Sequence, residues 1–170
     1  GFGCGKDPQH HPCDKNKVLE NVRYIKNNKN RPFYITMAHH FYNELLGQTK
    51  SIPDGLSAIL DQSYGLSWEI NDLGMDVINE LLDNSEGKRI LIDIKHMSIK
   101  SRQQYFDLLD TKYKDENIPL IFSHGGVNGL KDYSEAGIHV QGSKFNEWNI
   151  SIFDFEIVRL ARSKGIIGLN

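Results

Sequence analysis

The fold class is decided by the stretch ILIDIKH at residues 90–96, a short run of apolar and β-branched residues that ends in a histidine. Two other runs have the same form: residues 33–38 lead into His39-His40, and residues 118–123 lead into His124. Near-continuous apolar runs of this length are typical of strands buried in a parallel sheet. The carboxyl ends of parallel strands share one edge, where active sites are built. We therefore expect these histidines to gather at one edge of a sheet.

Helical spacing of apolar residues separates the predicted strands. It predicts helices that begin at Asp14 and Ser98, a helix over 73–82, and a helix opened by a capping box at Ser151-x-x-Asp154 and ended by Lys164-Gly165. A short helix is expected at 41–46, within a long connection over 39–68, and the chain closes on a predicted strand at 165–170. Residues 131–150 give no clear assignment. This alternation predicts a parallel α/β architecture with right-handed crossovers.

Four strands are half of a (β/α)8 TIM barrel, which typically needs about 250 residues. We therefore expect residues 1–170 to form a single partial barrel domain of about four strand–helix units, within a fragment of a longer chain, with 1–14 as an N-terminal loop. The alternative is a small, doubly wound open sheet.

Composition narrows the class of protein. The chain has 170 residues, of which 39% are hydrophobic and 25% charged, enough for one core. A net charge of −2 gives no reason to expect nucleic acid or an anionic membrane as a partner, and no membrane segment is visible. For Cys4 and Cys13 we favour free thiols over a disulfide or a second metal site with His10 and His11. The compartment stays open.

His96 and His124 are the strongest candidates for chemistry, because imidazoles from neighbouring strand ends can bind one zinc ion. The alternative is that they are hydrogen-bonded loop histidines. Of His39 and His40, we expect only one to face the site, since neighbours in an extended strand project to opposite faces, and we favour a packing role for His40. The same alternation argues against Asp93 as a partner that orients His96.

Other catalytic patterns fail. Ser123 and His124 are strand neighbours, so we expect them to project apart and not to form a nucleophile–base pair. No Gly-x-Ser-x-Gly elbow is present, and residues 1–7 lack the glycine spacing of a dinucleotide site. Trp68 and Trp148 are expected to pack in the core or in a covering loop.

Several segments together resemble a known family, the membrane (renal) dipeptidase-like metallopeptidases. The resemblance covers roughly residues 18–170, the central half of that family, and rests on these segments in order: YITMAH at 34–39, LGxxVI at 73–78, ILIDIKHMS at 90–98, PLIFSH at 119–124, 149–154, and GIIGLN at 165–170. It implies an amidohydrolase-like (β/α)8 barrel with two zinc ions at the carboxyl rim. It also implies that His96 and His124 are metal ligands and that His39 contacts the substrate.

The chain departs from the family pattern in several places. The family's His-x-Asp ligand pair is expected upstream, its catalytic aspartate downstream, and its bridging glutamate has no match in residues 1–17. Trp148 stands where the family has an arginine for the substrate carboxylate, just before the matched Asn149. Lys95 and Gly125-Gly126 replace small or hydroxyl residues.

These features predict a zinc-dependent, dipeptidase-like hydrolase of peptide or amide bonds. A metal-activated hydroxide would attack the carbonyl of a small substrate, and His39 would stabilise the oxyanion. The isolated fragment is expected to be inactive. The alternatives are a noncatalytic α/β binding module with structural histidines and a metal-independent barrel isomerase or lyase.

Overall fold

The computed structural model describes residues 13–57, 59–137 and 148–170, and it has an α/β fold. Four parallel strands form one sheet in the order β1-β2-β3-β4: β1 is Tyr34–Thr36, β2 Leu91–Asp93, β3 Ile121–Phe122 and β4 Ile166–Ile167. Helices alternate with the strands: α1 Lys15–Asn27, α3 Asp72–Leu82, α4 Ile99–Thr111 and α5 Asp154–Arg162. A short α2, Asp54–Ser57, and a 3-10 turn η1, Tyr133–Glu135, lie in connections. The predicted parallel alternation is confirmed.

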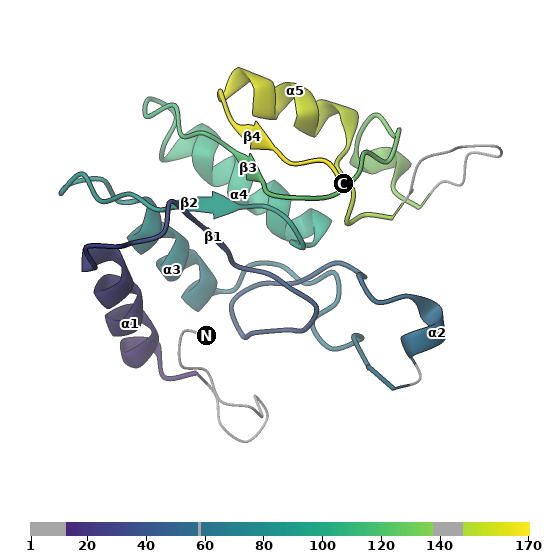
Figure 1. Ribbon diagram of the computed structural model, residues 1–170, viewed down its shortest axis with the longest axis horizontal. Coiled ribbons are helices and arrows are strands. Elements are labelled where there is room, and N and C mark those ends of the chain that lie inside the picture. Colours follow the sequence, from purple (N-terminus) through teal and green to yellow (C-terminus); the bar gives the residue numbers. More distant parts are fainter. Residues whose placement is uncertain (1–12, 58, 138–147) are drawn as a thin grey trace.

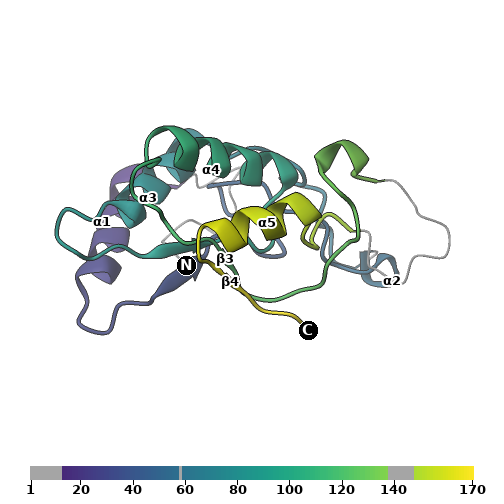
Figure 2. The same ribbon diagram turned by 90° about the horizontal axis from the view of Figure 1, so that it is seen from above.

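The helices α3, α4 and α5 lie along one face of the sheet (Figure 2). On that face Ile35 and Ile167 pack against the core, and α1 packs on α3. On the other face Tyr34 and Ile166 are 39% and 54% exposed. Within the described residues, β1 and β4 are the two edges of the sheet. The sheet is therefore covered by helices on one side, and on the second side the edge residues Tyr34 and Ile166 are exposed while Leu91 and Ile121 of the central strands are buried.

Two of the predicted helix starts are confirmed by their caps. The Asp14 carboxylate accepts hydrogen bonds from the amides of Asn16 and Lys17, and the Ser98 hydroxyl accepts one from the amide of Ser101. Such bonds satisfy amides that have no partner within the helix.

The predicted start of the last helix is wrong. Helix α5 begins at Asp154, three residues after Ser151, and the Glu156 carboxylate accepts the hydrogen bond of the Phe153 amide at 3.0 Å. The acidic side chain that closes this first turn is therefore Glu156, so the box predicted from Ser151 does not form.

The short helix expected at 41–46 is absent. The Asn43 side chain donates to the carbonyl of Met37 and accepts from the amide of Leu45, which offers the backbone an alternative to a helix. Leu46 and Gln48 instead form isolated bridges with residues of other segments. This connection and α2 extend beyond the carboxyl ends of the strands (Figure 1).

A buried ion pair joins α4 to α5. Arg102 Nη1 lies 2.8 Å from Glu156 Oε2, and both side chains are almost fully buried. The hydroxyl of Tyr133 donates to Glu156 Oε1 at 2.5 Å, and Arg102 Nη2 donates to the Asn149 carbonyl at 2.5 Å. Through Tyr133 and Asn149, this cluster fixes two residues of the 131–150 region, to which the sequence pattern assigns no clear element.

The structure also bears on two expectations from composition, the state of the cysteines and the lack of a membrane segment. Cys13 is disulfide-bonded, so the free thiol favoured from the sequence is wrong for this residue; it packs partly buried against the core, and its amide donates to Glu44. Cys4, His10 and His11 lie outside the described residues. Among the described helices, none has the length and apolar content needed to cross a membrane.

Candidate functional site

Four histidines lie together beyond the carboxyl ends of β1, β2 and β3. The ring centroid of His96 lies 5.3 Å from that of His124, 4.5 Å from that of His39 and 5.4 Å from that of His40. The sheet therefore brings the sequence-predicted residues into one cluster.

His96 is the buried member of the cluster. It is 5% exposed, and within the part of the chain that the structure describes neither ring nitrogen has a hydrogen-bond partner. Burial, followed by the positive charge of Lys95 and the nearby histidines, lowers its pKa to about 3, so the ring is neutral at physiological pH. A neutral imidazole with available nitrogen is the form that binds metals.

The backbone of His96 is in the left-handed region, with φ at 65°. Non-glycine residues adopt this region at a cost of about 1–3 kcal/mol, and such residues cluster at functional sites. The carbonyl of His96 accepts a hydrogen bond from the amide of Thr49, and the amide of Ser98 donates to Gly47. The 47–49 segment thus holds the turn that presents His96.

Lys95 is buried beside this turn. Desolvation lowers its pKa to about 8, and its ammonium donates to the carbonyl of Ile150 at 3.3 Å. A Cβ atom on Gly125, whose φ is 141°, would lie 2.7 Å from Lys95 Nζ. Lys95 and Gly125 are therefore linked, since glycine at 125 leaves room for the lysine side chain at 95.

The expectation that Ser123 and His124 project apart is wrong. Ser123 Oγ lies 2.8 Å from His124 Nδ1. Strand β3 ends at Phe122, so the alternation of a strand does not apply to this pair. Ser123 Oγ also lies 2.6 Å from Asp93 Oδ2, which links Asp93 to His124.

The expectation for His39 and His40 is also wrong. Both rings approach His96, and their own centroids are 4.0 Å apart. Strand β1 ends at Thr36, so the chain at 39–40 is no longer an extended strand. His40 Nδ1 lies 2.7 Å from Ser51 Oγ, and burial, followed by the charge of His39, lowers the pKa of His40.

Gln62 holds the segment around His40, and sequence analysis missed it. Its side-chain nitrogen, which has two protons to donate, lies within hydrogen-bond distance of the carbonyls of His40 and Thr49 and of Ser51 Oγ, while its Oε1 accepts from the amides of Ser51 and Ile52. A single glutamine in a polar connection carries no pattern that would have identified it.

The pair His96 and His124 has a spacing that suits zinc. Zinc binds imidazole nitrogen at about 2.0–2.1 Å, so two rings on one tetrahedral ion have centroids about 5 Å apart. The observed 5.3 Å agrees with this spacing, and the two unpartnered nitrogens of His96 have the required chemistry. Within residues 13–57, 59–137 and 148–170, no group of three or more His, Cys, Asp or Glu side chains is arranged to hold a metal ion.

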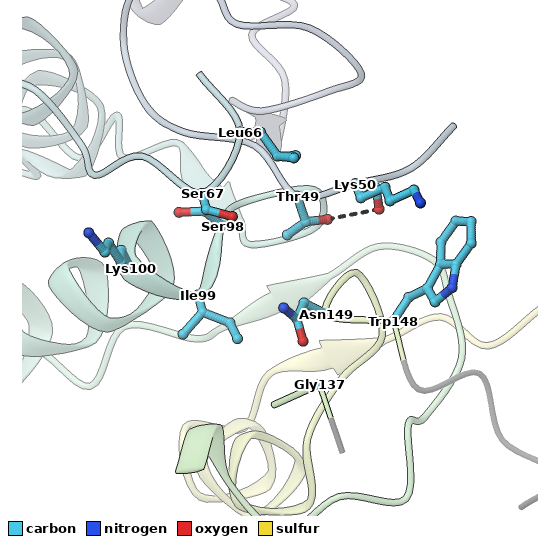
Figure 3. A pocket seen from close by; sticks show the side chains of 10 residues that line it. All are labelled: Thr49, Lys50, Leu66, Ser67, Ser98, Ile99, Lys100, Gly137, Trp148 and Asn149. Carbon is cyan, nitrogen blue, oxygen red and sulfur yellow. Dashed lines mark hydrogen bonds between the residues drawn. The ribbon is translucent and has the colours of Figure 1, made fainter. Parts of the chain in front are cut away.

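A pocket of about 470 Å³ is lined in part by Ser98, which follows His96 closely in the chain (Figure 3). Its wall includes Thr49, whose amide bonds to His96, and Trp148, whose ring centre lies 5.4 Å from Lys50 Nζ. Small-molecule sites commonly have this size and a mostly apolar lining with a few polar groups. The residues that line the pocket are Thr49, Lys50, Leu66, Ser67, Ser98, Ile99, Lys100, Gly137, Trp148 and Asn149.

Comparison with known proteins gives no match. No family model matches the chain, and no curated protein or solved structure matches it at a significant level.

Proposed function

We propose that this chain is part of a zinc-dependent hydrolase of small peptides or amides, similar to the membrane dipeptidase-like metallopeptidases. The observation that carries the proposal is His96, a buried imidazole whose two ring nitrogens have no hydrogen-bond partner among the described residues and whose backbone is in a strained conformation. Buried polar atoms are rarely left unpaired, and a metal ion would supply a partner for one of the two nitrogens.

We further propose that the sheet is part of a (β/α)8 barrel. Sequential strand order with helices on one face is the arrangement that a barrel requires, whereas a doubly wound sheet has helices on both faces. The exposed side chains of Tyr34 and Ile166 on the other face support the same proposal, because a closed barrel would bury that face.

His96 and His124 are the proposed ligands, and the other ligands would come from outside the described residues. A zinc ion in such a site supplies an activated water and polarises a carbonyl group. His39, whose ring lies 4.5 Å from that of His96, would donate a hydrogen bond to the oxygen on which negative charge develops. The neighbouring pocket, lined in part by Trp148 and Asn149, would hold the substrate side chain.

The test measures zinc content and turnover of a dipeptide in the complete protein. We expect His96→Ala and His124→Ala to lose bound zinc, and His39→Ala to keep the zinc and lose turnover. Lys88→Ala, in a solvent-accessible ion pair with Glu86 that precedes β2 and so lies at the end of the strand opposite to the site, serves as the matched control. Turnover that survives exhaustive chelation, or unchanged zinc content in both ligand variants, would contradict the proposal.

A noncatalytic α/β binding module is the second candidate. It is favoured by the absence of a third ligand among the described residues, since two histidines alone hold an ion weakly. The two candidates separate on flanking sequence: the hydrolase requires a His-x-Asp pair upstream and a strand-end aspartate downstream.

A further inference from the structure

Asp93 is a buried carboxylate at the carboxyl end of β2, and it accepts four hydrogen bonds. Its Oδ1 accepts from the main-chain amides of Lys95 and Ser123, each at 3.0 Å. Its Oδ2 accepts from the hydroxyls of Thr36 and Ser123, each at 2.6 Å. One carboxylate thus joins the ends of the three strands that lead into the histidine cluster.

Ser123 has one hydroxyl proton and two hydrogen-bond partners, Asp93 and His124, and this decides which group donates in each bond. A carboxylate can only accept, so the single proton of the Ser123 hydroxyl is donated to Asp93. The same oxygen lies 2.8 Å from His124 Nδ1 and has no second proton to give. His124 must therefore donate from Nδ1, which leaves the lone pair of a neutral ring on Nε2.

We infer that Ser123, held by Asp93, is a positioning residue that fixes His124 in the Nδ1–H tautomer. In one respect the inference rests on the proposed function, namely that the Nε2 lone pair is the one offered to zinc. Metal-binding histidines commonly have their other ring nitrogen fixed in this way by a hydrogen-bonded partner.

This direction of the bonds also separates Ser123 from a serine nucleophile. A nucleophilic serine gives its proton to an imidazole base, and that base is oriented by the carboxylate. Here the hydroxyl lies between the carboxylate and the imidazole, and its proton is directed to the carboxylate. The arrangement orients the ring and does not activate the serine.

The decisive variant is Asp93→Asn, which keeps the shape of the side chain and reverses two of its hydrogen bonds. The two main-chain amides can only donate, so they hold the asparagine oxygen at the Oδ1 position. The asparagine nitrogen then donates to the hydroxyls of Thr36 and Ser123. The Ser123 proton is released to His124 Nδ1, and the proton of the ring moves to Nε2.

The measurement is the tautomer of His124 in the metal-free chain, from long-range proton–nitrogen spectra of histidine-labelled protein at about pH 8, above the ordinary histidine pKa. We expect Nδ1–H in the unmodified chain and Nε2–H in Asp93→Asn. Zinc affinity, measured by competition with a chelator, should fall by about 10–100-fold in the variant.

Three further substitutions keep the test decisive if Asp93→Asn does not fold. Ser123→Ala removes the acceptor of the Nδ1 proton, so His124 should show a mixture of tautomers. Thr36→Val removes an equivalent 2.6 Å bond to the same Asp93 oxygen without touching His124, so the tautomer and zinc affinity should not change. Ser123→Thr, which keeps a hydroxyl, should restore the Nδ1–H form.

The inference is overturned if His124 carries its proton on Nε2 in the unmodified chain, or if Ser123→Ala and Asp93→Asn both leave the tautomer unchanged. If the tautomers change as expected but the unmodified protein binds no zinc, the role of Ser123 stands and the proposed function fails. The two failures are therefore distinguishable.

Discussion

Two buried polar groups of this fold differ in how they are satisfied. Between α4 and α5, Arg102 and Glu156 pair with each other, and both carboxylate oxygens of Glu156 have donors. Beyond the end of β2, His96 is also buried, yet neither of its ring nitrogens has a hydrogen-bond partner in the described ranges of the chain. Buried charges persist when they are paired, whereas an unpaired buried ring is a cost that the fold carries at this position. The first group supports the structure, and the second is available to a ligand.

The largest change in stability is expected when the buried pair of Arg102 and Glu156 is broken. Arg102→Ala leaves the Glu156 carboxylate buried without its cation, so we expect the free energy of unfolding to fall by about 3–5 kcal/mol. Urea denaturation followed by circular dichroism measures this loss.

Arg159→Ala is the matched control, because Arg159 forms a more exposed pair with Asp110 in the same helix pair. We expect this variant to lose about 1 kcal/mol or less. Equal losses in the two variants would contradict the distinction between the buried pair and the exposed pair.

Much of the fold could be predicted from local pattern. The runs at 90–95 and 118–123 contain the buried strands β2 and β3, and Asp14 and Ser98 cap helices as expected, because these signals act over a few residues. The long connection over 39–68 was predicted, but the path of its backbone could not be. Its path depends on contacts between distant residues, such as the close approach of Gly47 to the backbone of Trp68.

The site was predictable in its residues but not in its geometry. Strand alternation fails at His39, His40 and His124 because the strands end two or more residues before them. The bonds from Asp93 to Ser123 and from Ser123 to His124 depend on the pairing of β2 with β3, which no single segment of sequence specifies.

An intermediate effect is expected at Gln62, which is paired like Arg102 but lies beside the histidine cluster. Gln62→Ala leaves the buried amide of Ile52 and the carbonyl of Thr49 without partners, so we expect a loss of about 1–3 kcal/mol. Hydrogen exchange of the amides of Ser51 and Ile52 should become faster. Gln103→Ala, at an exposed glutamine of α4, is the control and should leave both quantities unchanged.

The smallest effect is expected at His96 itself. Glycine adopts a φ of 65° without strain, and His96→Gly also removes two buried nitrogens that lack partners. These gains offset the packing lost with the ring, so we expect the unfolding free energy of the metal-free chain to change by less than about 1 kcal/mol. Urea denaturation in chelator-treated buffer is the measurement, with Arg102→Ala as the reference for a residue that supports the structure. Zinc should then raise the stability of the unmodified chain and leave that of the variant unchanged.

A loss above about 2 kcal/mol without metal would show that His96 contributes to the core as Arg102 does. His96 would then be a structural residue like Arg102, and the proposed metal site would lose the observation on which it mainly rests.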